Sequence, residues 1–341
     1  MAKESAVSLK KGSTPVIKDV AACAGVSVAT VSRYLNGSSH LSALSAQKIA
    51  RAVEILGYRP SSVARGLAHS RMATIGVLSS NTTLLGSAMA IQGIEDEARS
   101  QGYSIMISRL DGESPEDLKR AIDLVLDVNP SGVVVLKYDE VAQRAREMIP
   151  RDIPLVVIGG SPEPLIDQIS LCEYAGGRRM TEYLLELGHS TVAHIGVPIR
   201  SQGTSRADGW ESVLKERGIP VPPIIATTWD PADARVVGRQ LAHEHPATAI
   251  FAGNDEIAMG VIRGLEDAGV RVPDDISVVG FDDHSLAAVW NPGITTYRQN
   301  FVAAGRAAVA ALLARWEGRT QPPQLVEVAG ELVERESARR V

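Results

Sequence analysis

The chain has 341 residues, 45% of them hydrophobic and 22% charged, and a formal net charge of −5 at pH 7, which predicts two or three domains with a sizeable core. Its two cysteines, Cys23 and Cys172, are too far apart for a metal motif and predict a reducing compartment without a disulfide framework. Since the polar N-terminus lacks an apolar signal segment and no apolar run approaches a membrane span, we expect a cytoplasmic protein. Without a metal-ligand spacing in the sequence, we expect neither a metal nor a cofactor.

The first part of the chain shows three short helical patterns. Residues 1–13 are expected to form a disordered lead, and the patterns lie within residues 14–60, in "IKDVAACA", "VATVSRYLN" and "SALSAQKIARAVEIL". Gly25 supplies a turn between the first two patterns, and Ser27 is suited to cap the second helix. Two short helices joined by a tight glycine turn predict a helix-turn-helix.

Charge distinguishes this region from an ordinary helical hairpin, which periodicity alone supports equally well. Over residues 1–70 nine Lys or Arg residues stand against three acidic residues, a net charge of +6, which leaves −11 for the remainder. A basic head on an acidic body indicates that the head meets a polyanion such as DNA.

Beyond a connector over residues 61–72, strands and helices alternate twice in series. "TIGVL", "YSIMIS", "GVVVL" and "PLVVIG" form the first series of strands, and "TVAHIGV", "TAIFAG" and "ISVVGF" the second, with amphipathic helices between them. Apolar strands separated by helices predict parallel sheets covered on both faces. We therefore expect residues 73–341 to form two lobes, an N lobe over about 73–165 and 297–325 and a C lobe over about 166–296 and 326–341.

Polar side chains follow several of these strands, at the edge where ligands bind in open α/β sheets. Asn81, Asn254 and Asp282 stand at strand ends, and Trp229 and Arg206 lie in neighbouring loops. Each alone has a plainer interpretation, because an acidic or amide side chain at a strand end more often caps a helix. Together, carboxylates, amides, an Arg and a Trp around one cleft suit a polyhydroxylated ligand such as a sugar.

An enzyme using this cleft is a weaker interpretation. The sequence contains no phosphate-binding loop, nucleophile elbow or zinc-protease motif. Asp282 and Asp283 are adjacent, so in an extended segment they would point to opposite sides and form a poor acid–base pair. We expect no catalytic residues.

The motifs of both parts closely resemble the lac-repressor and galactose-repressor (LacI/GalR) family of transcriptional regulators. The resemblance rests on "IKDVAACAGVSVATVSRYLNGSSHLS", "ILGYRPSSVARGLA", "YLLELGH", "AGND", "RVPDDISVVGFDD" and "ITTYRQNF", and it spans about residues 14–337. It implies an all-α helix-turn-helix DNA-binding domain followed by a periplasmic-binding-protein-like core of two doubly wound lobes. Residues 61–72 would then hold a hinge helix.

The resemblance also implies which residues meet DNA. Positions that read base edges match Val28, Ala29 and Arg33, and Arg33 suits a bidentate contact to guanine. Positions that contact phosphate or brace the helix match Ser27, Thr30, Ser32, Asn36 and His40. In the hinge, Leu67 beside Ala64 matches the side chain that enters the minor groove.

In the core, the family's effector-pocket positions match Arg206, Trp229, Asn254, Asp282, Gln299 and Phe301. The sequence departs from the family at "NTTLLGS", where many members carry aromatic residues, and at Val16, where a Thr usually caps the first helix, so the cap must be weaker or come from Thr14. These departures leave the identity of the effector open.

The sequence thus predicts a regulator, most simply a repressor, whose binding to operator DNA responds to a mono- or disaccharide. A homodimer on a pseudo-palindromic operator is expected, because no heptad leucine tail that would join two dimers follows "LVERES". The alternative is a sugar-binding protein of the periplasmic type that does not bind DNA. The basic head argues against that alternative.

Overall fold

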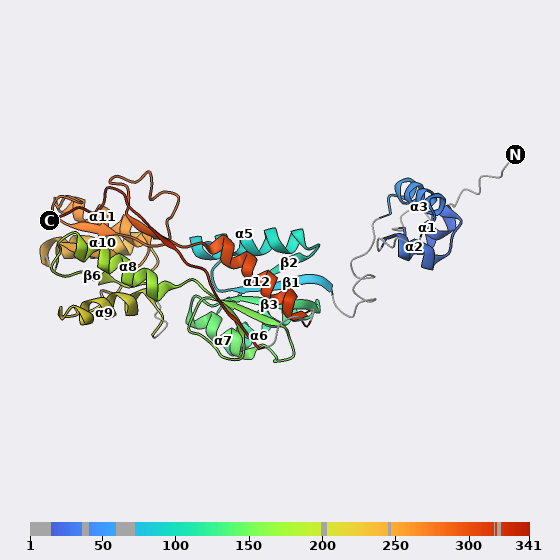
Figure 1. Cartoon of the computed structure of the whole chain (residues 1–341), viewed down its shortest axis with the longest axis horizontal. Coiled ribbons are helices and arrows are strands. Elements are labelled where there is room, and N and C mark those ends of the chain that lie inside the picture. Colours follow the sequence, from blue (N-terminus) through green and yellow to red (C-terminus); the bar gives the residue numbers. More distant parts are fainter. Residues whose placement is uncertain are drawn as a thin grey trace. The chain divides into compact units, whose positions relative to one another are not determined.

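A computed structural model describes most of the chain, namely residues 15–35, 41–58, 72–112, 114–198, 203–244, 247–316, 318 and 322–341. The chain divides into two compact units between Met72 and Ala73 (Figure 1). The predicted lead and most of the hinge segment lie outside the described residues, and so do Asn36, His40, Ala64 and Leu67. Among the described helices, none has the length and apolarity needed to cross a membrane.

The first unit is a three-helix domain, as the helical patterns predict. Its helices are α1 (Ile17–Ala24), α2 (Val28–Leu35) and α3 (Ala43–Leu56). Gly25 ends α1 in the left-handed conformation with φ 67°, which a glycine adopts without strain. The Asp19 carboxylate accepts a hydrogen bond from the Val16 N–H at 2.8 Å and so supports the start of α1, where Val16 has no side-chain acceptor.

A small apolar core holds these three helices together. Val20, Val31 and Ile49, one from each helix, are fully buried, and Tyr58 covers the core after α3. The Ser27 hydroxyl accepts a hydrogen bond from the Thr30 N–H at 3.2 Å, which confirms Ser27 as the cap of α2. Val31 is the fully buried residue of α2, and Val28, Ala29 and Arg33 of this helix remain exposed.

The N lobe of the second unit is a six-stranded sheet in the order β10-β5-β4-β3-β1-β2. Its strands are β1 (Met72–Ser79), β2 (Ser104–Arg109), β3 (Pro130–Leu136), β4 (Leu155–Ile158), β5 (Asp167–Ser170) and β10 (Leu325–Glu327). The pairs β1–β2, β3–β4, β4–β5 and β5–β10 are parallel. Its helices are α5 (Leu85–Ser100), α6 (Pro115–Leu126), α7 (Glu140–Met148) and α12 (Phe301–Trp316).

Helices cover both faces of this sheet, as the near-continuous apolar strands predict. Figure 1 shows α5 and α12 on one face and α6 and α7 on the other, and each pair packs on its own apolar cluster. Every residue of β3 is buried, as expected for a strand covered on both faces.

The C lobe repeats this architecture on a smaller sheet. Its parallel strands, in the order β6-β7-β8, are β6 (Ala193–Ile195), β7 (Ala249–Ala252) and β8 (Ser277–Val279). One face carries α10 (Pro231–Glu244) and α11 (Asp255–Asp267), and the other carries α8 (Glu173–Glu186) and α9 (Arg206–Glu216). Two doubly wound lobes are therefore present.

An antiparallel ribbon of β9 (Thr296–Arg298) and β11 (Glu331–Val333) completes the C lobe and packs against α8. The chain crosses between the lobes at residues 171–172, 299–300 and 328–330, because β5, α12 and β10 belong to the N lobe. The lobe boundaries expected from the sequence therefore differ by a few residues from those that strand pairing sets. Local periodicity does not show that β5 pairs with β10, because paired residues such as Gln168 and Leu325 lie 157 residues apart in the sequence.

Candidate functional site

The exposed surface of α2 carries the residues predicted to read DNA. Val28, Ala29 and Arg33 are exposed, while Thr30 and Ser32 are half-buried. The Arg33 Nε donates to the Ala29 carbonyl at 3.4 Å, and no described acidic side chain pairs with its guanidinium. This helix therefore exposes two small apolar side chains and the Arg33 guanidinium, a combination suited to base edges in a major groove.

A cavity of about 260 Å³ lies between the two lobes of the core. Segments that follow the carboxyl ends of β1, β3 and β4 line it from the N lobe, and segments that follow β6, β7 and β8 line it from the C lobe. This is the edge of an open parallel sheet at which ligands bind. The strand ends of the two lobes therefore line the same cavity.

Arg206, at the start of α9, organises the polar side of this cavity. It is buried, and its Nη2 donates to the Glu173 carboxylate at 2.8 Å, while its Nη1 lies 3.4 Å from the Asp282 carboxylate and bonds to the Gly253 carbonyl. Its guanidinium carbon lies 4.1 Å above the centre of the Phe281 ring. The two carboxylates and the ring fix the guanidinium plane toward the cavity.

Asp282 has an unusual ionisation in this setting. Burial raises the pKa of its carboxyl to about 7; the Arg206 charge lowers it, and the negative charges of Glu173 and Glu256 raise it further. Asp282 therefore changes charge close to neutral pH.

This pKa predicts how the stability of the core depends on pH. The usual value is 3.8, so between pH 5 and 7 the folded chain holds a proton on Asp282 that the unfolded chain has released. Stability then falls as the pH rises through this range, by up to ~1.4 kcal/mol per pH unit. Urea unfolding at pH 5, 6 and 7 should show Asp282→Asn gaining stability relative to the wild type as the pH rises. A difference that stays constant with pH would contradict the raised pKa.

The structure brings six of the seven predicted effector residues together around the cavity, namely Asn81, Arg206, Trp229, Asn254, Asp282 and Phe301. Gln299 lies elsewhere, because its Nε2 donates to the Leu171 carbonyl at 3.1 Å and it does not line the cavity. It joins two of the crossing segments.

Two of these residues also stabilise the local backbone through hydrogen bonds. The Asn254 Oδ1 accepts the Ile257 N–H at 2.8 Å and caps α11, as the plainer interpretation expects. The Asn81 Oδ1 accepts the Thr83 N–H at 2.8 Å and shapes the turn before α5. A side chain can therefore cap a helix and face the cavity at once.

The cavity also contains charged residues that sequence reasoning missed, namely Lys137, Asp139, Glu173 and Glu256. Lys137 and Asp139 lie within three residues of the end of β3. The expectation that polar residues after strand ends line the cavity could therefore have found them. Many members of the family carry aromatic residues in the stretch that matches "NTTLLGS"; in this chain, Leu84 and Leu85 of that stretch line the cavity.

The adjacent carboxylates Asp282 and Asp283 face different partners, although not because the segment is extended. Both residues have positive φ, 97° and 57°. Asp282 lies toward Arg206, and Asp283 pairs with Arg298 and Arg335. They do not form an acid–base pair.

Family comparisons match both units of the chain. Residues 16–61 match bacterial regulatory proteins of the lacI family, and residues 181–338 match a periplasmic binding protein-like domain. The match over 16–61 includes α1, α2 and α3, which argues against a sugar-binding protein that does not bind DNA.

Whole-chain relatives agree with these matches. The HTH-type transcriptional repressor PurR of Vibrio atlanticus (strain LGP32) is 32% identical over 330 residues, which cover 95% of this chain and 98% of that protein. The ribose operon repressor of Escherichia coli (strain K12) is 31% identical over 332 residues, covering 94% and 99%. These relatives are repressors and not enzymes.

Solved structures show the same architecture. The lac repressor dimer bound to operator and the anti-inducer ONPF matches with a TM-score of 0.87 at 29% identity, covering 96% of this chain and all of that one (100%). The complex of the transcriptional regulator CelR with cellobiose matches with a TM-score of 0.71 at 26% identity, covering 95% and 99%. The chain therefore belongs to the lacI family of bacterial regulatory proteins, which are DNA-binding regulators of transcription.

Proposed function

We propose that this protein is a cytoplasmic, homodimeric repressor that binds a pseudo-palindromic operator and releases it when a mono- or disaccharide occupies the cavity between the lobes. The observation that carries the DNA-binding part is the surface of α2, where Val28, Ala29 and Arg33 are exposed on a helix fixed by a buried core. In a dimer, two copies of α2 would enter successive major grooves.

The composition of the cavity supports a sugar-like effector. Arg206, Asn254 and Asp282 supply donors and acceptors that can fork onto vicinal hydroxyl groups, and Trp229 and Phe301 offer apolar faces for a sugar ring. Relatives of this fold have been solved with cellobiose and with ONPG, which agrees with a ligand of this class. The cavity volume of about 260 Å³ suits a small ligand of this kind.

A gel shift against the region upstream of the protein's own gene tests this function, with Arg33→Ala as the decisive variant. Loss of a bidentate contact to guanine should weaken specific binding by about 1–3 kcal/mol and relax the choice at one G·C pair. Random DNA of the same length should lose little affinity.

Lys18→Ala is the matched control, because Lys18 is an exposed cation on α1, the helix that crosses the backbone in this motif. It should weaken all DNA sequences alike and lower the salt slope by about one. The recognition role of α2 is wrong if Arg33→Ala weakens specific and random DNA equally.

A further inference from the structure

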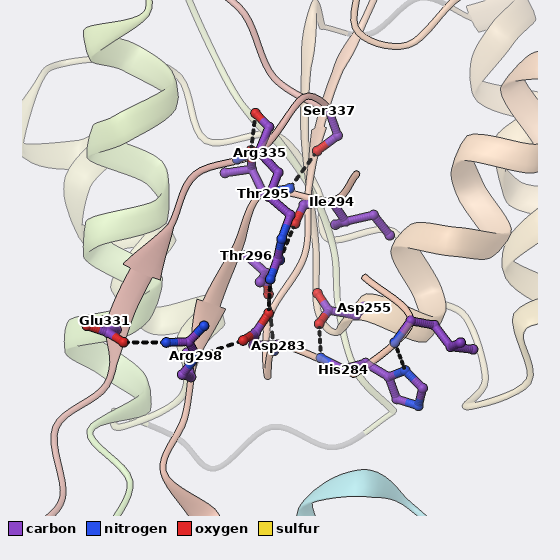
Figure 2. A network of polar contacts seen from close by, with 11 residues as sticks. Asp255, Asp283, His284, Ile294, Thr295, Thr296, Arg298, Glu331, Arg335 and Ser337 are labelled. Carbon is purple, nitrogen blue, oxygen red and sulfur yellow. Dashed lines mark hydrogen bonds and ion pairs between the residues drawn. The ribbon is translucent and has the colours of Figure 1, made fainter. Parts of the chain in front are cut away.

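Asp283 lies at a junction between the cavity and the segments that cross between the lobes. Its neighbour Asp282 lines the cavity, whereas Asp283 is not among the lining residues and its side chain is 12% exposed. Each of its two carboxylate oxygens holds one guanidinium: Oδ2 accepts from the Arg298 Nε at 2.7 Å, and Oδ1 accepts from the Arg335 Nη2 at 2.7 Å (Figure 2).

Both of these arginines belong to the β9–β11 ribbon or its continuation. Arg298 is the last residue of β9, directly before the chain crosses to α12, and it pairs in register with Glu331, the first residue after the return crossing. The Arg298 Nη1 also donates to the Glu331 carboxylate at 2.6 Å. Arg335 follows β11 and donates through Nη1 to the Ile294 carbonyl at 2.7 Å (Figure 2). One carboxylate thus holds Arg298, at the end of the ribbon next to the crossings, and Arg335, beyond the opposite end of the ribbon.

The backbone makes the same connection from the side of the cavity. The Asp282 N–H donates to the Tyr297 carbonyl at 2.8 Å, so the loop that carries the cavity carboxylate is fixed to β9. Asp282 and Asp283 are consecutive non-glycine residues with positive φ, a conformation that persists where surrounding contacts determine it. A displacement of Asp282 would therefore be passed to Asp283 and to the arginines that it holds.

Charge keeps this junction in place. Partial burial by itself would raise the pKa of Asp283, but the hydrogen bonds and charges of Arg298 and Arg335 outweigh it and lower that pKa below its usual range. The carboxylate is therefore ionised at neutral pH and keeps both partners.

We propose that Asp283 is a positioning residue that couples occupancy of the cavity at Asp282 to the segments crossing between the lobes. The proposal rests on the proposed function, since it assigns the residue through which a sugar changes operator binding. Asp283 does not line the cavity, so its role is separate from sugar recognition.

Asp283→Asn in the full-length dimer tests the proposal, because it keeps the shape of the side chain and removes its charge. The probe is the sugar among D-ribose, D-glucose, D-galactose and cellobiose that raises the thermal midpoint most. Its affinity is measured with and without operator DNA. In the wild type we expect the two affinities to differ by about 5- to 150-fold. In the variant this ratio should fall toward one, while affinity without DNA changes less than about threefold.

Asp267→Asn is the control, since the Asp267 side chain is 15% exposed and pairs with Arg235 at 2.6 Å on the α10–α11 face. It should leave the ratio unchanged. An unchanged ratio in Asp283→Asn, or an equal fall in Asp267→Asn, would overturn the proposal.

A second measurement needs neither sugar nor operator and separates this proposal from the proposed function. Asp282→Asn should increase amide hydrogen exchange in residues 296–300 and 328–335 of the full chain. In the Asp283→Asn background the same substitution should produce no further increase. If no sugar of the panel binds, the proposed effector class fails, but this exchange experiment still decides the role of Asp283. An undiminished response to Asp282→Asn in that background would overturn it.

Discussion

Replacing Arg206 with Met is expected to destabilise the core by ~3 kcal/mol and to abolish sugar binding. The substitution leaves Glu173 and Asp282 without their cation, and breaking a buried ion pair from one side costs about 3–5 kcal/mol. The lower end applies because the Glu173 side chain is 31% exposed and water can replace part of its interaction. The Met side chain still packs on Phe281, so the loss reports on charge and hydrogen bonding.

Urea unfolding followed by tryptophan fluorescence measures this loss in the core alone. All four tryptophans belong to the second unit: Trp210, Trp229, Trp290 and Trp316. Arg239→Met is the matched control, because the Arg239 side chain is 46% exposed and lies 3.5 Å from Asp267. Such a surface pair is worth about 0–1 kcal/mol. Equal losses in the two variants, or sugar binding that survives Arg206→Met, would contradict the organising role of Arg206.

Asp282→Ala is expected to weaken sugar binding at least ~100-fold and to leave operator affinity within about twofold. A carboxylate that accepts two sugar hydroxyls contributes about 1.5–3 kcal/mol per bond, so the loss of two bonds exceeds a hundredfold in affinity. Operator affinity in the absence of sugar is expected to be retained, because Asp282 lies outside the unit that contains α2 and its core and the substitution removes a contact to sugar, not to DNA. The sugar-induced change in tryptophan fluorescence measures binding, since Trp229 lines the cavity.

Asp230→Ala serves as the control for this variant. Asp230 is exposed, follows Trp229 directly, and accepts the Ala232 N–H at 2.8 Å near the start of α10. It should bind sugars as the wild type does. If the Asp282→Ala variant binds every tested sugar as the wild type does, the effector site lies elsewhere.

The architecture could be predicted from the sequence because it depends on local patterns. Apolar strands alternate with amphipathic helices, and Gly25 marks the turn before α2. The position of Asn254 and Asp282 after strand ends also predicted that they line the cavity, since the carboxyl ends of parallel strands meet at one edge.

The remaining features depend on contacts between distant segments. Glu173 lines the cavity and accepts a hydrogen bond from Arg206, which lies 33 residues later and belongs to another helix. Gln299 was predicted there from the family match, but its amide instead bonds to Leu171, 128 residues earlier. The junction at Asp283 needs β9 and β11 to pair, and that pairing leaves no local pattern in the sequence.

Titrating the effector with and without operator DNA at fixed salt tests the central claim, that sugar occupancy and operator binding are linked. Linkage is reciprocal, so a sugar that releases the operator must bind the operator complex more weakly by the same factor. A sugar with equal affinity for both lobe arrangements would shift nothing. We expect weaker sugar binding in the presence of operator, by about 5- to 150-fold. Tighter binding would make the sugar a corepressor, and identical affinities would contradict the allosteric account.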